Sequence, residues 1–99
     1  MTAYVCIVEV ELHIGDSHDL KAKRKVLHSL KASLRQRFGA AVAEIGGHDT
    51  WQCATILCAL VGDAEVSARA DELCRYVEAR VPDGCSFQRD LRSLEDLRG

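Results

Sequence analysis

The sequence has little proline, few aromatic side chains and no long apolar run. Pro82 is the single proline in 99 residues, and Phe, Trp and Tyr together make up 5% of the chain. The longest uninterrupted apolar run covers residues 56–61, far short of the roughly 20 residues that a membrane helix needs. The start of the chain lacks the basic flank and cleavage site of a signal peptide. We therefore expect a cytoplasmic protein with no membrane partner.

Metal-binding and redox motifs are also missing, although the chain has five cysteines. No CxxC or HxxxH spacing occurs, so we expect neither a metal nor another cofactor. An odd cysteine count without a signal peptide predicts free thiols in a reducing compartment, most of them buried as small apolar side chains. The closest pair, Cys53 and Cys58, is five residues apart, which places the two on opposite faces of a strand. The others are Cys6, Cys74 and Cys85.

The remaining composition is typical of one small globular domain spanning residues 1–99. Apolar residues make up 47% of the chain and charged residues 28%, which excludes disordered and fibrous classes. Hydrophobic periodicity then predicts the element order βαββαβ. The predicted strands cover 3–14, 40–46, 50–61 and 85–92, and the predicted helices cover 20–38 and 64–81.

This order predicts an α+β fold of the ferredoxin-like type, in which two helices cover one face of a four-stranded antiparallel sheet. Asp19 is a candidate N-cap for the first helix, and Gly39 is well placed to end it. Lys23 and Arg37 fall on the apolar side of that helix, and we expect both to extend along it to solvent. The expected apolar stripes are Leu20, Val26, Leu27, Leu30, Leu34 and Phe38 in the first helix and Val66, Ala70, Leu73, Cys74, Val77 and Val81 in the second.

The sheet face without helices is expected to be half apolar. Val5, Ile7, Trp51 and Leu57 should lie on it, together with Cys53 and Thr55. Exposed apolar faces usually mark interfaces, so one hypothesis is an oligomeric module, such as a homodimer, that uses this face. The lone tryptophan could anchor a partner, but packing in the core or an interface is the favoured interpretation. A single aromatic on this face argues against RNA reading by stacking, which needs several. Leu91, Leu94 and Leu97 near the end of the sequence are not assigned clearly to any element.

Charge is the strongest local signal in the sequence. The segment 20–38 holds seven of the thirteen Lys and Arg residues and none of the fifteen acids, so the rest of the chain has a net charge of −9. Like charges spaced four residues apart destabilise a helix, and a phosphate backbone or an acidic protein surface would offset that cost. The alternative is a solvated face, or a patch paired with the acidic second helix in an oligomer. The candidate binding residues, placed opposite the apolar stripe, are Lys21, Arg24, Lys25, His28, Lys31 and Arg35.

Catalytic motifs are absent, and we assign no catalytic residue. The sequence contains no nucleophile elbow, Gly-rich phosphate loop or paired-carboxylate motif. A secondary candidate site consists of His48, Asp49 and Cys53, which would suit a small thiol-dependent enzyme. The main hypothesis is a non-enzymatic protein that docks through its basic helix.

Two segments resemble the YlxP-like family, a small bacterial family of unknown function. Residues 20–30, LKAKRKVLHSL, resemble its S-L-K-x-K-R-x-x-x-x-S-L helix start, and residues 42–55 resemble its V-A-E … D-x-W-Q-R-A hairpin. The resemblance implies a ferredoxin-like fold and a role near the ribosome or RNA, with no catalytic residues to transfer. Asp19, the pair Gly46–Gly47 and Cys53 depart from the pattern and mark a divergent member.

Overall fold

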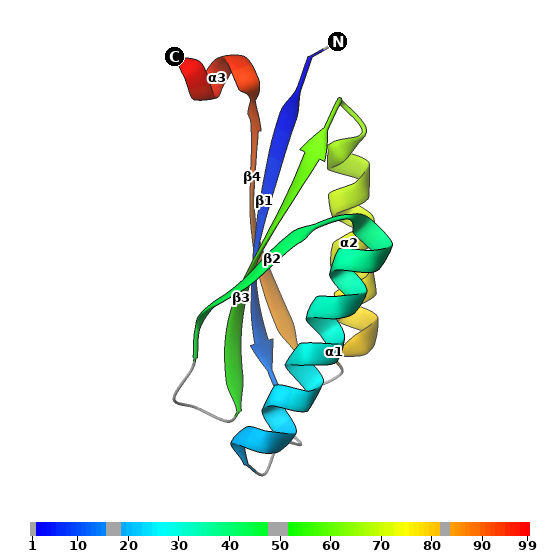
Figure 1. Cartoon of the computed structure of the whole chain (residues 1–99), viewed down its shortest axis with the longest axis vertical. Coiled ribbons are helices and arrows are strands. Elements are labelled where there is room, and N and C mark those ends of the chain that lie inside the picture. Colours follow the sequence, from blue (N-terminus) through cyan, green and yellow to red (C-terminus); the bar gives the residue numbers. More distant parts are fainter. Residues whose placement is uncertain (1, 16–18, 48–51, 82–83) are drawn as a thin grey trace.

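The computed structural model describes residues 2–15, 19–47, 52–81 and 84–99, and it has the predicted element order with one addition (Figure 1). Four strands and two long helices follow one another as βαββαβ, and a short helix follows the last strand. The elements are β1 (Tyr4–His13), α1 (Leu20–Phe38), β2 (Ala41–Gly46), β3 (Cys53–Gly62), α2 (Val66–Arg80), β4 (Cys85–Ser93) and α3 (Leu94–Arg98).

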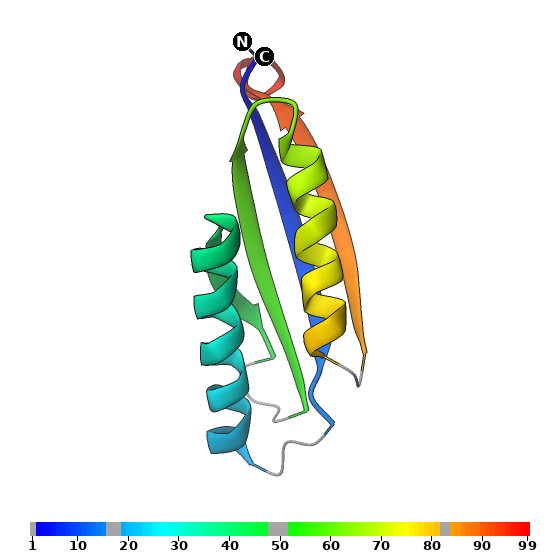
Figure 2. The same cartoon turned by 90° about the vertical axis from the view of Figure 1, so that its right-hand side faces the viewer.

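The strands form one antiparallel sheet in the order β2-β3-β1-β4. Both long helices lie on the same side of this sheet (Figure 2). The ferredoxin-like α+β fold predicted from the sequence is confirmed. No helix in the described part of the chain is long and apolar enough to cross a membrane.

The core lies between the sheet and the two helices, and the alternation within the central strands defines it. Alternate residues are buried from Cys6 to Leu12 in β1 and from Ala54 to Leu60 in β3, and Val8 pairs directly with Cys58. The predicted stripe of α2 is buried along its whole length. The buried strand residues are Cys6, Val8, Val10, Leu12, Ala54, Ile56, Cys58 and Leu60.

The ends of α1 follow local sequence signals. The Asp19 carboxylate accepts a hydrogen bond from the Ala22 amide at 2.8 Å, as an N-cap does. Gly39 has a φ of 64° and its amide bonds the Arg35 carbonyl, which closes the helix in the left-handed conformation that glycine tolerates. Both predicted caps are confirmed.

The predicted apolar stripe of α1 is partly wrong. Lys23, Leu27, Leu30 and Leu34 are buried, whereas Val26 is 43% exposed. These four buried positions follow one row at spacings of 4, 3 and 4, so a residue at a flank of that row, such as Val26, faces outward. Leu20 is exposed as well.

The short helix α3, which the sequence analysis did not predict, follows β4. The Ser93 hydroxyl accepts a hydrogen bond from the Asp96 amide, and the Asp96 carboxylate accepts one from the Ser93 amide. This reciprocal capping box starts α3 directly after β4. Leu94 and Leu97, which we left unassigned, belong to this helix and are exposed.

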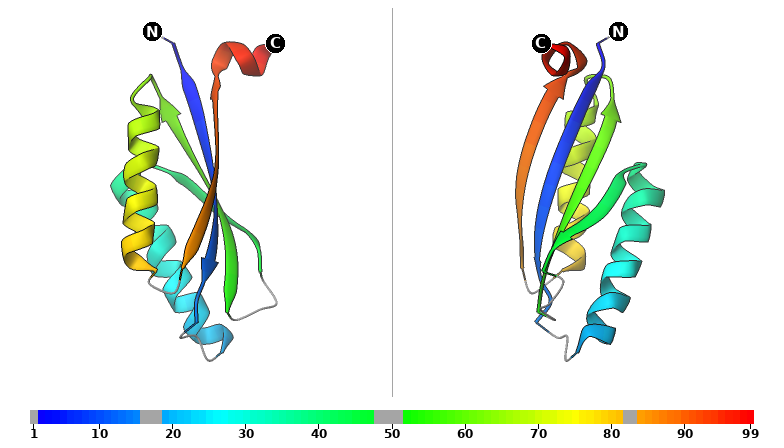
Figure 3. Two further views of the ribbon diagram at one scale, coloured as in Figure 1. Left: turned by 180° about the vertical axis from the view of Figure 1, so that it is seen from behind. Right: turned by 60° about the vertical axis from the view of Figure 1, so that its left-hand side comes forward.

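The opposite sheet face carries no helix (Figure 3). Val5 and Leu57 on it are half buried, and Ile7 is 38% exposed. Cys53, exposed, and Thr55 share this face, as the alternation predicts. Trp51, the remaining candidate interface residue, lies outside the described residues.

Candidate nucleic-acid interface

The candidate basic residues of α1 gather on the flank of the helix next to β2. Arg24, His28, Lys31 and Arg35 follow one row at spacings of 4, 3 and 4, which we call the basic row. The guanidinium of Arg35 donates to the Val42 carbonyl of β2 at 2.9 Å, which fixes the direction of the row. The sequence analysis placed these residues opposite the apolar stripe. In the structure the basic row lies at the flank of that stripe, beside the short strand β2.

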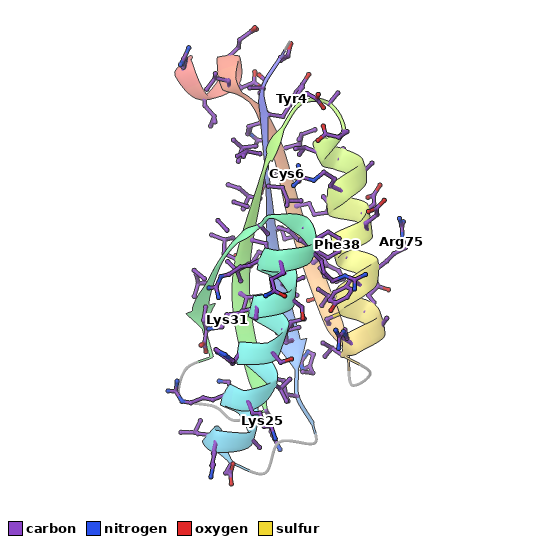
Figure 4. The ribbon with its side chains drawn as sticks, turned by 45° about the vertical axis from the view of Figure 1, so that its right-hand side comes forward. Tyr4, Cys6, Lys25, Lys31, Phe38 and Arg75 are labelled. Atoms are coloured by element: carbon purple, nitrogen blue, oxygen red, sulfur yellow. The ribbon has the colours of Figure 1, made fainter. Side chains whose placement is uncertain are left out.

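Two further candidates stand beside the basic row. Lys21 and Lys25 are exposed and lie on the outward side of α1. Figure 4 shows Lys25 and Lys31 on α1, and Arg75 on the outer side of α2. The six predicted binding residues therefore lie on one helix and form one continuous cationic surface.

A hollow of about 440 Å³ lies where this surface meets β2. Its one acidic residue, among the described residues that line it, is Glu44 of β2. The lining residues are Arg24, Lys25, Leu27, His28, Lys31 and Glu44. Positive charge therefore dominates the hollow.

Lys23 is buried beneath this surface and partly neutralises the negative charge of Glu44. It is 2% exposed, the only buried charged side chain in the part of the chain that the structure describes. Its Nζ donates to the Gly47 carbonyl and lies 4.0 Å from Oε2 of Glu44. A buried charge is tolerated when it is paired and hydrogen-bonded, and here the pair also offsets the negative charge at the hollow.

Our expectation that Lys23 extends to solvent is wrong. The signal that was available is its place in the buried row, four residues before Leu27 and seven before Leu30. An apolar row interrupted by one lysine needs a counter-charge, and Glu44 supplies it from the following strand. Lys23 and Glu44 also belong to the two segments that carry the family resemblance, so a direct contact joins those segments.

Gly47 completes this contact at the end of the β2–β3 hairpin. Its φ is 75°, and a Cβ there would lie 2.7 Å from the Cys53 carbonyl oxygen. No larger residue fits that position without moving the backbone. Gly47, one of the positions that depart from the family pattern, also presents its carbonyl to Lys23.

Arginines elsewhere in the fold have partners of their own. Arg69 of α2 donates to the Phe38 carbonyl at 2.6 Å and to the Val61 carbonyl at 3.1 Å. Arg89 of β4 bonds the Asp71 carboxylate at 2.5 Å, and this hydrogen bond, followed by the guanidinium charge, lowers the pKa of Asp71. In the described part of the chain, no ion pair joins the basic row to the acids of α2.

The secondary candidate site is only partly within the described residues. Cys53 Sγ lies 4.0 Å from Nδ1 of His13, a pairing that the sequence did not predict. His48 and Asp49 lie outside the described residues. No cluster of three or more His, Cys, Asp or Glu that could hold a metal ion occurs among the residues described.

The other thiols are all less exposed than Cys53. Burial, and then the neighbouring Cys74, raises the pKa of the Cys58 thiol to about 11. Cys6, Cys58 and Cys74 are buried, Cys85 is partly buried, and all five thiols are free. Buried, protonated thiols behave as small apolar side chains, as predicted for most of them.

Comparisons with known proteins concern the family and, separately, the fold. The profile of the DUF503 family, described as a protein of unknown function, matches residues 5–86. The chain is 33% identical to the uncharacterized protein YlxP of Bacillus subtilis (strain 168) over 63 residues, which cover 64% of this chain and 68% of that protein. Among solved structures it is similar to the de novo designed protein Foldit4, with a TM-score of 0.54 and 8% identity over 92% of this chain and 94% of that chain. This last likeness concerns the fold alone.

Proposed function

We propose a function for this chain, which belongs to the DUF503 family of proteins of unknown function: it binds RNA, free or in a ribosomal particle, through the basic row of α1. The observation that carries the proposal is the row itself. Three cationic side chains and one histidine line one flank of a helix, and Glu44, the one acid among the described residues that line the hollow, faces a buried lysine. In this proposal the protein is a binding protein and not an enzyme.

The length of the row favours a polyanion over a single anion. Arg24 and Arg35 are eleven residues apart, which corresponds to about 16 Å along a helix. A row of that length meets several successive phosphates, and each contact releases condensed counterions. The basic row makes no base-specific arrangement that we can identify, so we expect backbone recognition with little sequence preference.

Charge reversal in the row tests the proposal. In the Arg24→Glu/Lys31→Glu variant we expect affinity for a single-stranded RNA of mixed sequence to fall at least about a hundredfold at low salt, because two phosphate contacts become repulsive. Filter binding or fluorescence anisotropy measures this. Arg75→Glu/Arg98→Glu is the matched control, since it changes the net charge equally on exposed residues away from α1.

Three results would refute the proposal. The first is wild-type protein that shows no RNA affinity at low salt. The second is an equal loss of affinity in both double variants, which would indicate net charge and not the row. The third is an unchanged affinity in Arg24→Glu/Lys31→Glu.

The open sheet face favours a second function, self-association. Val61 is 65% exposed and pairs with Val5, and the next row joins Ile7 to Ala59. Two such faces would bury this apolar strip in a homodimer. Light scattering should show a concentration-dependent mass that Ile7→Lys reduces to that of a monomer. A monomer mass at every concentration would exclude this function and leave RNA binding unaffected.

A further inference from the structure

We propose that a groove between α1 and α2 binds a small amphipathic carboxylate. The groove has a volume of about 310 Å³ and lies on the flank of α1 that faces away from β2. Its apolar lining comes from Val26 and Leu30 of α1 and from Val81 at the end of α2. The exposure of Val26, which departs from the predicted stripe, is therefore exposure to this groove.

The remaining lining of the groove is polar and cationic. Lys25 and Arg80 bring one positive charge from each helix, and Ser29 and Ser33 add two hydroxyls. None of the described lining residues is acidic. An apolar floor with a few convergent polar groups is the usual composition of a small-molecule site, and the charge here suits an anion.

Neighbouring side chains hold the cationic end in place. The Arg37 and Arg80 guanidinium carbons each lie 4.8 Å from the centre of the Tyr76 ring, and Arg80 also donates to the Tyr76 hydroxyl. The ring packs edge-on against Phe38, with centroids 5.6 Å apart. Because these contacts already order Arg80, its side chain loses less conformational entropy when it pairs with an incoming carboxylate.

The size and chemistry of the groove select one kind of occupant. A volume of about 310 Å³ is at the lower end for small-molecule sites and too small for a helix, which is about 10 Å wide. Val26, Leu30 and Val81 offer a nucleobase no hydrogen-bonding groups. A short hydrocarbon body on the floor, with its carboxylate at Arg80 and the serine hydroxyls, satisfies both parts of the lining.

The experiment is a titration of the ¹⁵N-labelled protein followed by ¹H–¹⁵N spectra. Octanoate is the probe, octanol has the apolar body alone, and inorganic phosphate has the charge alone. We expect saturable shifts with octanoate at the amides of 25–33 and 76–81, and binding about tenfold weaker with octanol. Phosphate should give no saturable shift at the amides of 76–81, which lie at the groove and away from the basic row.

Two variants separate the parts of the site. Arg80→Gln should weaken octanoate about tenfold and leave octanol unchanged, because only the carboxylate contacts the guanidinium. Val26→Phe fills the groove from an exposed position and should weaken both ligands. Arg75→Gln, on the outer side of α2, should change neither. Well-dispersed spectra of the variants show that each one is folded.

Any of the following results overturns the proposal. One is the lack of a saturable octanoate shift in the millimolar range. A second is equal affinity for octanoate and octanol. A third is a set of shifts on the open sheet face in place of the groove, and a fourth is an Arg80→Gln variant that binds octanoate like the wild type. Neither Arg80→Gln nor Val26→Phe alters the basic row, so the outcome for these variants is independent of RNA binding.

Discussion

The two long helices lie on the same sheet face but relate to it differently. Every residue of the apolar stripe of α2 is buried, from Val66 to Val81. In α1 the buried row includes Lys23, and Leu20 and Val26 are exposed at its flanks. Helix α2 packs with its whole apolar surface, whereas α1 buries a narrow row and leaves both flanks accessible.

The two helices also differ in whether their charged side chains have partners. Arg69 pairs with Glu65 within α2, and Asp71 pairs with Arg89 of β4. Within the described part of the chain, Lys21, Arg24, Lys25 and Lys31 have no such carboxylate partner. A helix that accumulates unpaired like charges is less stable for it, and the proposed RNA contact would offset this cost in α1.

The largest contrast should come from truncating one apolar side chain on each helix. Leu73→Ala in α2 removes a fully buried side chain and should lower the free energy of unfolding by about 2–5 kcal/mol. Val26→Ala in α1 should change it by less than about 1 kcal/mol, because the side chain is already partly in water. Urea denaturation measures both. Equal losses would remove the distinction between the helices.

The next largest effect concerns the buried charge of α1. Lys23→Ala should cost about 2–3 kcal/mol, below the range for fully buried pairs because Glu44 keeps some contact with solvent. The double variant Lys23→Met/Glu44→Leu should recover much of that stability, since an apolar pair replaces a buried ionic one. Lys25→Ala, on the exposed side, is the control. A Lys23→Ala variant as stable as this control would show that the buried contact is unimportant.

A smaller effect concerns the pH dependence of the ion pair between Asp71 of α2 and Arg89 of β4. The folded-state pKa of Asp71 lies below its ordinary value of 3.8, because Arg89 donates to the carboxylate and attracts its charge. The stabilisation is therefore complete above that ordinary value and is lost as the pH falls through the lowered one. Asp71→Asn should be slightly less stable than wild type at neutral pH, and the difference should shrink in strong acid. A difference that stays constant down to strong acid would contradict the assignment.

Much of the fold could be predicted because its signals are local. Alternation in residues 4–13 defines β1, and Asp19 and Gly39 mark the ends of α1. The burial of Lys23 could not be predicted, because it depends on Glu44 and Gly47 in the following hairpin. A helical wheel shows which residues share a side but not which strand that side faces.

The candidate site was predicted residue by residue but not in its placement. The sequence identified the basic side chains, and the structure shows that the Arg35–Val42 contact turns them toward β2. The inter-helix groove had no sequence signal, since Val26 and Val81 belong to separate stripes that looked fully buried. Helix α3 did have a sequence signal, the Ser93–Asp96 capping box, which the sequence analysis did not use.

The salt dependence of RNA affinity tests the central claim most directly. For single-stranded RNA, the slope of log affinity against log salt changes by about 0.7 for each phosphate contact. Neutralising two residues of the row in Arg24→Gln/Lys31→Gln should therefore make the slope shallower by about 1.4, while Arg75→Gln/Arg98→Gln should leave it unchanged. An identical slope in wild type and in both variants would contradict the account, because the row would then contact no phosphates.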